Sequence, residues 1–407
     1  MVTRGLHGGL ARCAYREPVA TPAVGQTGEA GRVDRLGPFS PVGVYLLVRA
    51  VGVVVVAWMA SHNHVDTPLT HLLAEWDGQW YLGIAHGGYD GAPAGLTDAM
   101  GVRDAFTSMG YLPGYPAVVA AVGLLPGLGL LGAALWISAI AGSVAALGVA
   151  RLGTLVTGSP RAGLILVALF AGAPMAIALS MAYTEALFCA LAAWALVGVL
   201  ERRWLLAGAC TASAGLVRPT GNALVLAVVL AALHELWTRR DDRRALVAVV
   251  LAPVGLVAWL AWVASRTDRL TGWFELRSRG WNDGFDSTSR AGQHLLDVLS
   301  GQNVVLMDIV AVASLLGAAV LLVLCARTVP WPLVVYAGTM LAVVAFTNGF
   351  TTTYARLLLP AAFVLLIPVA RALAECEDRT QLGLVTGAVL VGSWIGGYAL
   401  AVYPNAI

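Results

Sequence analysis

Apolar residues in this chain gather in long runs, separated by short polar stretches, from about residue 42 to the end. A helix that crosses roughly 30 Å of hydrocarbon needs about 20 apolar residues. The runs therefore predict an all-α, polytopic transmembrane fold with about eleven spanning helices. The candidate spans lie near residues 42–61, 130–150, 161–180, 183–200, 204–217, 219–237, 245–264, 303–326, 331–347, 356–372 and 382–403.

Two stretches between these runs are long loops, residues 62–129 and 265–302. Long ordered loops in compact proteins tend to carry function. In the first loop, apolar residues recur every three or four positions over residues 70–86, which predicts a helix lying on the membrane surface. Residues 112–128 are interrupted by proline and glycine, and we expect them to form a second interfacial helix.

The N-terminal residues 1–40 are polar and rich in glycine, proline and arginine. They lack the apolar run of a signal peptide, so we expect a disordered N-terminal tail. Residues 41–407 then form one transmembrane domain.

The composition agrees with a membrane protein. The chain is 58% hydrophobic and 12% charged, about half the charge of a typical soluble domain. The chain has no lysine, so arginine supplies its formal positive charge, and the net charge of +2 gives no argument for a nucleic-acid partner. The five cysteines form no CxxC pair, so neither a disulfide framework nor a zinc site is indicated.

Arginine placement orients the spans, because basic residues favour the cytoplasmic side. The arginines between spans fall at alternate ends, so one face collects most of them. This places the N-terminus in the cytoplasm and both long loops on the extracytoplasmic side of the cell membrane. The arginines that define this face are Arg151, Arg161, Arg202, Arg203, Arg239, Arg240, Arg243, Arg244, Arg327, Arg371 and Arg379.

The first loop holds the strongest catalytic candidate, Asp77, which lies between Trp76 and Trp80. A partly desolvated carboxylate is a better proton acceptor, which suits a general base. The alternative is an acidic residue that only stabilises the start of a helix. Glu75 is the second candidate base, although it does not share a helix face with Asp77.

Arg218 is flanked by long apolar segments, where an arginine is costly and usually has an anionic partner. A phosphate fits the guanidinium fork, and the helix that follows adds backbone donors. The alternative partner is Glu185, which opens a span on the outer side. Glu185 itself either caps that helix or belongs to the site.

Two further groups have less specific patterns. Tyr354 and Arg356 lie where an outer loop meets a helix, and they are either interfacial anchors or site residues. Trp281, with Asn282 and Asp283, is typical of sugar stacking on composition alone. The polar residues His62, His64, Asp66 and His71 lack the spacing of metal ligands, so no metal site is predicted.

Several short motifs follow one another along the chain. They are Trp76-Asp77-Gly78 with Tyr81, Ile84-Ala85 and Gly88-Tyr89, then Tyr111 to Pro116, Tyr183 to Phe188, Arg218 to Gly221 and Arg356 to Pro360. Together they resemble the PIG-V-like mannosyltransferases of the GT-C class of membrane glycosyltransferases. The resemblance begins near residue 42, and the order of its motifs is its most specific property. Gly114 and Leu112 depart from the family pattern, at positions that the resemblance assigns to the acceptor pocket.

The resemblance implies an inverting glycosyltransferase that takes its sugar, mannose by analogy, from a polyprenyl-phosphate donor. Asp77 would act as the base, while Arg218 and Arg356 would hold the phosphate. His86 and Tyr115, within the matching motifs, are further substrate-binding candidates. The acceptor would be a lipid, glycolipid or protein at the extracytoplasmic face. No cofactor and no metal are expected.

A transporter or lipid flippase is the main alternative, since it would use the same intramembrane arginine and glutamate. No internal inverted repeat is visible, and the acidic residues cluster in an outer loop instead of mid-span. A third interpretation is a membrane scaffold or an inactive relative. The presence of Asp77 favours an enzyme.

Overall fold

The computed structural model describes residues 37, 39–239, 243–282, 284, 290–301, 304–346 and 351–405. Every regular element in these ranges is a helix, which confirms the predicted all-α fold. The predicted tail falls almost wholly outside the described residues.

Most of the long apolar runs form helices that are long enough to span a membrane. In the described part of the chain, six helices are long and apolar enough to do so, or seven if one pair bent by 50° is counted as one span. The unbroken ones are α2 (Ser40–His62), α6 (Gly129–Thr157), α10 (Gly221–Thr238), α15 (Leu306–Thr328) and α19 (Asp378–Ala401). The sixth combines α11 (Arg244–Leu251) with α12 (Val254–Thr267), and the bent pair is α17 (Tyr354–Leu365) with α18 (Ile367–Ala374).

Shorter apolar helices occupy the other predicted spans, so the expected number of apolar segments is roughly right. They are α7 (Pro160–Ala171), α8 (Glu185–Leu200), α9 (Trp204–Gly215) and α16 (Trp331–Phe346). The predicted span 161–180 differs in one respect, because its α-helix ends at Ala171. Pro174 lacks a backbone N–H, and Met175 adopts a left-handed conformation with φ of 62°. The chain resumes as the 3₁₀ helix η2 (Ala176–Ser180).

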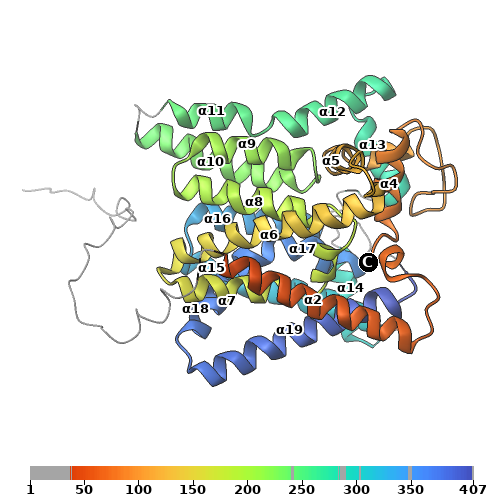
Figure 1. Ribbon diagram of the computed structural model, residues 1–407. Coiled ribbons are helices and arrows are strands. Elements are labelled where there is room, and N and C mark those ends of the chain that lie inside the picture. The colour runs from red at the N-terminus through yellow and green to blue at the C-terminus, as the bar shows by residue number, and fades with distance from the viewer. Residues whose placement is uncertain are drawn as a thin grey trace, which may run out of the picture. The chain divides into compact units, whose positions relative to one another are not determined.

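The helices run side by side (Figure 1), and small residues lie where they touch. A Cβ added at Gly153 would lie 2.9 Å from Cα of Gly163, and one at Gly198 would lie 2.9 Å from the Ala207 amide nitrogen. Such contacts let backbones approach closely, as is usual between helices in membranes.

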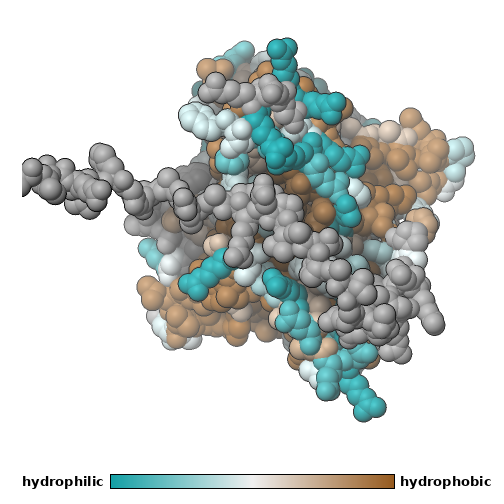
Figure 2. All heavy atoms as spheres, turned by 90° about the vertical axis from the view of Figure 1, so that its left-hand side faces the viewer, coloured by the Kyte–Doolittle hydropathy of each residue, from teal (hydrophilic) through white to brown (hydrophobic). Residues whose placement is uncertain are grey.

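Ion pairs join helix termini at one end of the bundle. Arg151 pairs with Glu201, Arg202 with Glu235, and Arg161 with Asp378. Hydrophilic side chains cross this end of the molecule in Figure 2. The pairs bring together the ends of α6, α8, α10, α7 and α19, as the alternation of arginines predicts.

The short helices gather at the opposite end (Figure 1). They are α3 (Leu69–Leu72), α4 (Asp77–Gly87), η1 (Thr107–Gly110), α5 (Gly114–Gly123), α13 (Gly272–Trp281), α14 (Arg290–Leu299) and η3 (Thr351–Thr353). The helix predicted over 70–86 is therefore two helices, because Trp76 adopts φ of 58° and ψ of −118°, which no helix contains. The second predicted helix is present as α5, and the interfacial placement of both remains a prediction.

Candidate active site

Asp77 is the first residue of α4, and the strained residue Trp76 fixes where that helix begins. A non-glycine residue at this positive φ is unfavourable, and such strain concentrates at functional sites. The Trp76 side chain is partly exposed and does not line the cavity described below. Trp76 therefore contributes to the site through its backbone, which sets the orientation of Asp77 at the start of α4.

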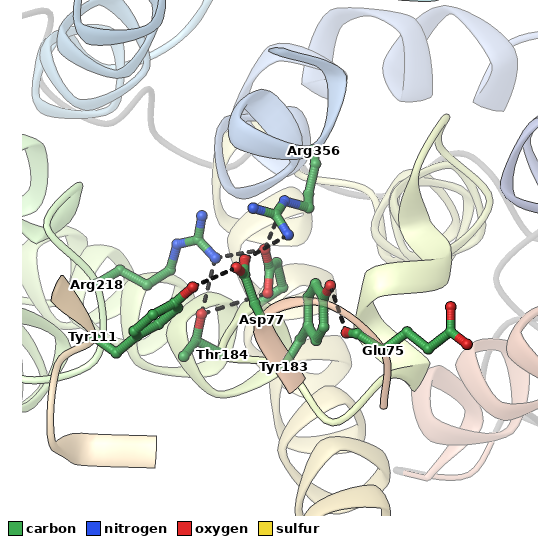
Figure 3. Close-up of polar contacts among 8 residues, drawn as sticks. Glu75, Asp77, Tyr111, Tyr183, Thr184, Arg218 and Arg356 are labelled. Atoms are coloured by element: carbon green, nitrogen blue, oxygen red, sulfur yellow. Dashed lines mark hydrogen bonds and ion pairs between the residues drawn. The ribbon is translucent and has the colours of Figure 1, made fainter. Parts of the chain in front are cut away.

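Asp77 belongs to a group of four charged residues, the charge cluster, which also contains Glu185, Arg218 and Arg356. Figure 3 labels Asp77 and the two arginines. Arg356 Nη1 lies 2.9 Å from Asp77 Oδ2, and Arg218 Nη1 lies 2.5 Å from Glu185 Oε1. Arg356 Nε lies 3.6 Å from the same Glu185 oxygen, so Glu185 links the two arginines. The formal charges of the four side chains cancel.

The four charges differ in exposure. The Glu185 side chain is 1% exposed and that of Arg218 is 9% exposed, whereas the Asp77 carboxylate is 26% exposed. The Thr184 hydroxyl accepts a hydrogen bond of 2.9 Å from Arg218 Nη1. Glu185 is thus the buried counter-charge, and Asp77 is the carboxylate that a substrate can reach.

Two hydrogen bonds join the segments that carry the two carboxylates. The Ala182 amide donates to the Leu73 carbonyl at 2.8 Å, and the Tyr183 hydroxyl donates to the Glu75 carbonyl at 3.1 Å (Figure 3). These contacts place the start of α8 beside the start of α4, although more than a hundred residues separate them.

Tyr111 completes the environment of Asp77. Its hydroxyl donates to Asp77 Oδ1 at 3.1 Å, so both carboxylate oxygens have partners. The Tyr111 ring stacks on Trp80 with centroids 5.2 Å apart and lies nearly perpendicular to the Trp281 ring, with centroids 5.6 Å apart. Burial, followed by the charge of Asp77, raises the pKa of Tyr111 well above 10, so the phenol remains a proton donor.

A cavity of about 930 Å³ opens above the charge cluster. Its polar end contains Asp77, Thr184, Arg218 and Arg356, and its walls come from α12, α13, α16 and α17. The aliphatic wall residues are Leu256, Leu260, Val343, Val344 and Leu357. On α13, Trp273, Phe274, Arg277, Arg279 and Trp281 face the same space. The cavity therefore brings the charge cluster together with an aliphatic wall and with the aromatic and charged side chains of α13.

The structure brings only part of the predicted site together. Asp77, Arg218, Tyr354 and Arg356 line the cavity, and Glu185 lies directly behind them. Trp281 also lines it, whereas Asp283 is outside the described residues.

Three predicted residues lie elsewhere. The Glu75 side chain turns away from the charge cluster (Figure 3), and partial burial raises its pKa. Tyr115 is fully buried, with its hydroxyl 3.0 Å from the Ala134 carbonyl, and His86 is exposed in the last turn of α4. Neither side chain, nor that of Glu75, lines the cavity.

Tyr111 and Thr184 lie within the sequence motifs, but no role was predicted for either residue. The signal for Tyr111 was its place in the aromatic-proline motif, and Thr184 was marked only by its position beside Glu185. Within the described ranges, no three histidine, cysteine or acidic side chains gather as metal ligands, and the histidines of the first loop are no exception.

The architecture is the fold of the GT-C membrane glycosyltransferases. Among solved structures, the chain is similar to ArnT from Cupriavidus metallidurans bound to undecaprenyl phosphate, with 20% identity and a TM-score of 0.51, over 86% of this chain and 62% of ArnT. It also matches the Archaeoglobus fulgidus oligosaccharyltransferase AglB, with 14% identity and a TM-score of 0.47, over 89% of this chain and 56% of AglB. The chain thus spans about three fifths of the length of these proteins. No family model and no curated protein matches the sequence.

Proposed function

We propose that this protein is an inverting glycosyltransferase that moves one sugar from a polyprenyl-phosphate donor to an acceptor hydroxyl. The observation that carries the proposal is the single cavity in which Asp77, Arg218 and Arg356 meet an apolar wall. The GT-C fold supports it, and the ArnT structure contains undecaprenyl phosphate.

The reaction needs one base and one anion site. The acceptor oxygen attacks the anomeric carbon of the donor sugar, and its proton passes to Asp77. The bond between the anomeric carbon and the phosphate oxygen breaks on the opposite face, so the configuration inverts. The polyprenyl phosphate leaves with the electron pair of that bond.

During this step, negative charge moves from Asp77 to the donor phosphate. Asp77 loses its charge as it accepts the proton, while the phosphate gains one. Arg218 and Arg356 are placed to stabilise the growing phosphate charge in a site shielded from water. Their guanidinium forks suit phosphate oxygens better than an ammonium group would.

Donor binding also prepares the base. Without substrate, Arg356 and Tyr111 occupy both oxygens of Asp77. A phosphate competes with Asp77 for Arg356, and the freed Oδ2 is then available to the acceptor hydroxyl. The donor therefore binds before the acceptor in productive turnover.

The apolar wall suits the first isoprene units of the donor, because α12, α16 and α17 present aliphatic side chains next to the phosphate site. Trp281 lines the cavity and offers an aromatic side chain on which a sugar ring can stack. A mannosyl donor follows from the PIG-V-like motifs, with a lipid, glycolipid or protein as the acceptor. The arginine-rich end would face the cytoplasm with the N-terminus, and the cavity the extracytoplasmic side.

The test uses purified protein, polyprenyl-phosphate [³H]mannose and a membrane extract as the source of acceptors. Transfer of label to a lipid or protein product supports the proposal, and wild-type protein that gives no product contradicts it. Flux of the labelled lipid across proteoliposomes without chemical change would support the transporter instead. Parallel donors that carry glucose or galactose decide the sugar.

A further inference from the structure

Arg49 is a second buried arginine, and the proposed chemistry does not use it. It lies in α2 and is 6% exposed, so its charge sits inside the protein within a membrane span. Nη1 donates to the Ala171 carbonyl at 2.7 Å and Nε donates to Ser180 Oγ at 2.9 Å. Both partners are neutral, and within the described residues Nη2 has none. A buried intramembrane charge of this kind is costly and calls for a function.

The two partners of Arg49 are the two ends of the broken segment between α7 and α8. Ala171 is the last residue of α7, and Ser180 is the last residue of η2. With 12 residues, α7 rises about 18 Å, so the chain leaves the helix well before it could cross a bilayer. Irregular backbone at that depth needs partners inside the protein. The positive guanidinium also stabilises the negative C-terminal end of α7.

A second side chain of α2 holds the same segment. The Tyr45 hydroxyl lies 3.5 Å from the Leu179 carbonyl, and Tyr45 is one helical turn before Arg49. One face of α2 therefore presents two polar groups to η2.

The segment that Arg49 holds runs directly into the active site. Four residues after Ser180, Thr184 accepts the hydrogen bond from Arg218, and Glu185 follows. Between Ser180 and Thr184, the Ala182 amide donates a hydrogen bond to the Leu73 carbonyl. A shift at Ser180 would thus move Thr184 and Glu185 relative to Asp77.

We infer that Arg49 is a positioning residue, which fixes the 171–184 segment so that Thr184 and Glu185 hold Arg218 for the donor phosphate. This inference rests on the proposed function for its kinetic consequence. The guanidinium fork presents two nitrogens to these two acceptors in fixed directions, whereas a lysine would present its donors from a single nitrogen on a flexible stem.

The experiment compares Arg49→Lys and Ser180→Ala with Arg161→Lys as the matched control. Arg161 belongs to the opposite end of α7, where it bonds to Asp378 and Gln381 and does not touch the segment. Each variant is assayed for kcat and donor KM per folded protein and for amide exchange in peptides that cover residues 178–186.

Arg49→Lys should lower kcat by about 10- to 100-fold, since a misplacement near 1 Å can cost about 100-fold. It should also speed exchange across 178–186, and Ser180→Ala should show the same changes to a smaller degree. Arg161→Lys should lower the melting temperature with kcat and exchange in 178–186 unchanged.

Folded Arg49→Lys with wild-type kcat and wild-type exchange would overturn the inference. Equal losses in Arg49→Lys and Arg161→Lys would also overturn it, because they indicate a merely structural role. If wild type transfers no sugar, the proposed function fails, while the exchange measurement still decides whether Arg49 holds the segment.

Discussion

Asp77→Asn is the substitution that most directly tests the proposed chemistry. Asparagine has the same shape and keeps an oxygen for the Tyr111 hydroxyl, but it has no charge for Arg356 and cannot accept the proton. The carboxylate lies 2.9 Å from Arg356 Nη1 in a partly buried pair. Loss of one hydrogen bond to a charged group costs about 1.5–3 kcal/mol. We expect Asp77→Asn to lower the free energy of unfolding by an amount at the lower end of this range, because Glu185 still lies 3.6 Å from Arg356 Nε.

The effect on catalysis should be larger than the effect on stability. A positioned general base contributes about 10²- to 10⁴-fold to the rate, which corresponds to about 2.7–5.5 kcal/mol of activation free energy. Single-turnover transfer of labelled sugar, with enzyme in excess over donor, measures this step without product release. We expect the rate constant of Asp77→Asn to fall by at least about 100-fold.

Glu75→Gln is the control for this experiment. Glu75 contributes its main-chain carbonyl to Tyr183, and its side chain points away from the cavity, so the variant should retain full activity. Full activity in Asp77→Asn, or a loss in Glu75→Gln equal to that expected for Asp77→Asn, would refute the assignment of the base.

Other consequences are open to measurement. Tyr111→Phe removes one hydrogen bond to Asp77 and should lower kcat by about 3- to 10-fold. The shape of its pH–rate profile should stay unchanged up to pH 10, because burial keeps the pKa of Tyr111 above that value; loss of an alkaline limb would contradict this. Arg218→Lys should weaken binding of polyprenyl phosphate by about 10-fold, measured by quenching of tryptophan fluorescence, and unchanged binding would exclude Arg218 from the phosphate site. Product polyprenyl phosphate should compete with the donor and not with the acceptor, and the reverse pattern would contradict binding of the donor first.

The membrane helices could be predicted from sequence because their signal is local. About 20 apolar residues in succession define a span whatever surrounds them. The break after Ala171 was not predicted, because hydropathy stays high through η2, and only Pro174 marks the end of the helix. The division of the first-loop helix was missed for a similar reason, since apolar spacing continues across Trp76 while its backbone does not follow a helix.

Residues of the candidate site could be predicted from sequence where a single side chain is costly to place beside apolar segments. Arg218 and Glu185 stand out because charge beside apolar segments needs a partner, and the structure pairs them at 2.5 Å. Tyr111 and Thr184 carry no such cost, so their roles depend on contacts across the fold. Tyr115 also lies within a matching motif, but in the structure its buried hydroxyl donates a hydrogen bond to the Ala134 carbonyl of α6.

The charge cluster also has a consequence for the way the chain is made. Its four members are spread along the sequence, and synthesis releases Asp77, Glu185 and Arg218 long before Arg356. Until α17 emerges, the two carboxylates of the cluster share a single guanidinium, and the cluster holds one excess negative charge. Arg356 neutralises that charge when α17 joins the bundle. The active site is therefore balanced in charge only late in synthesis, when α19 is the one described spanning helix still to follow.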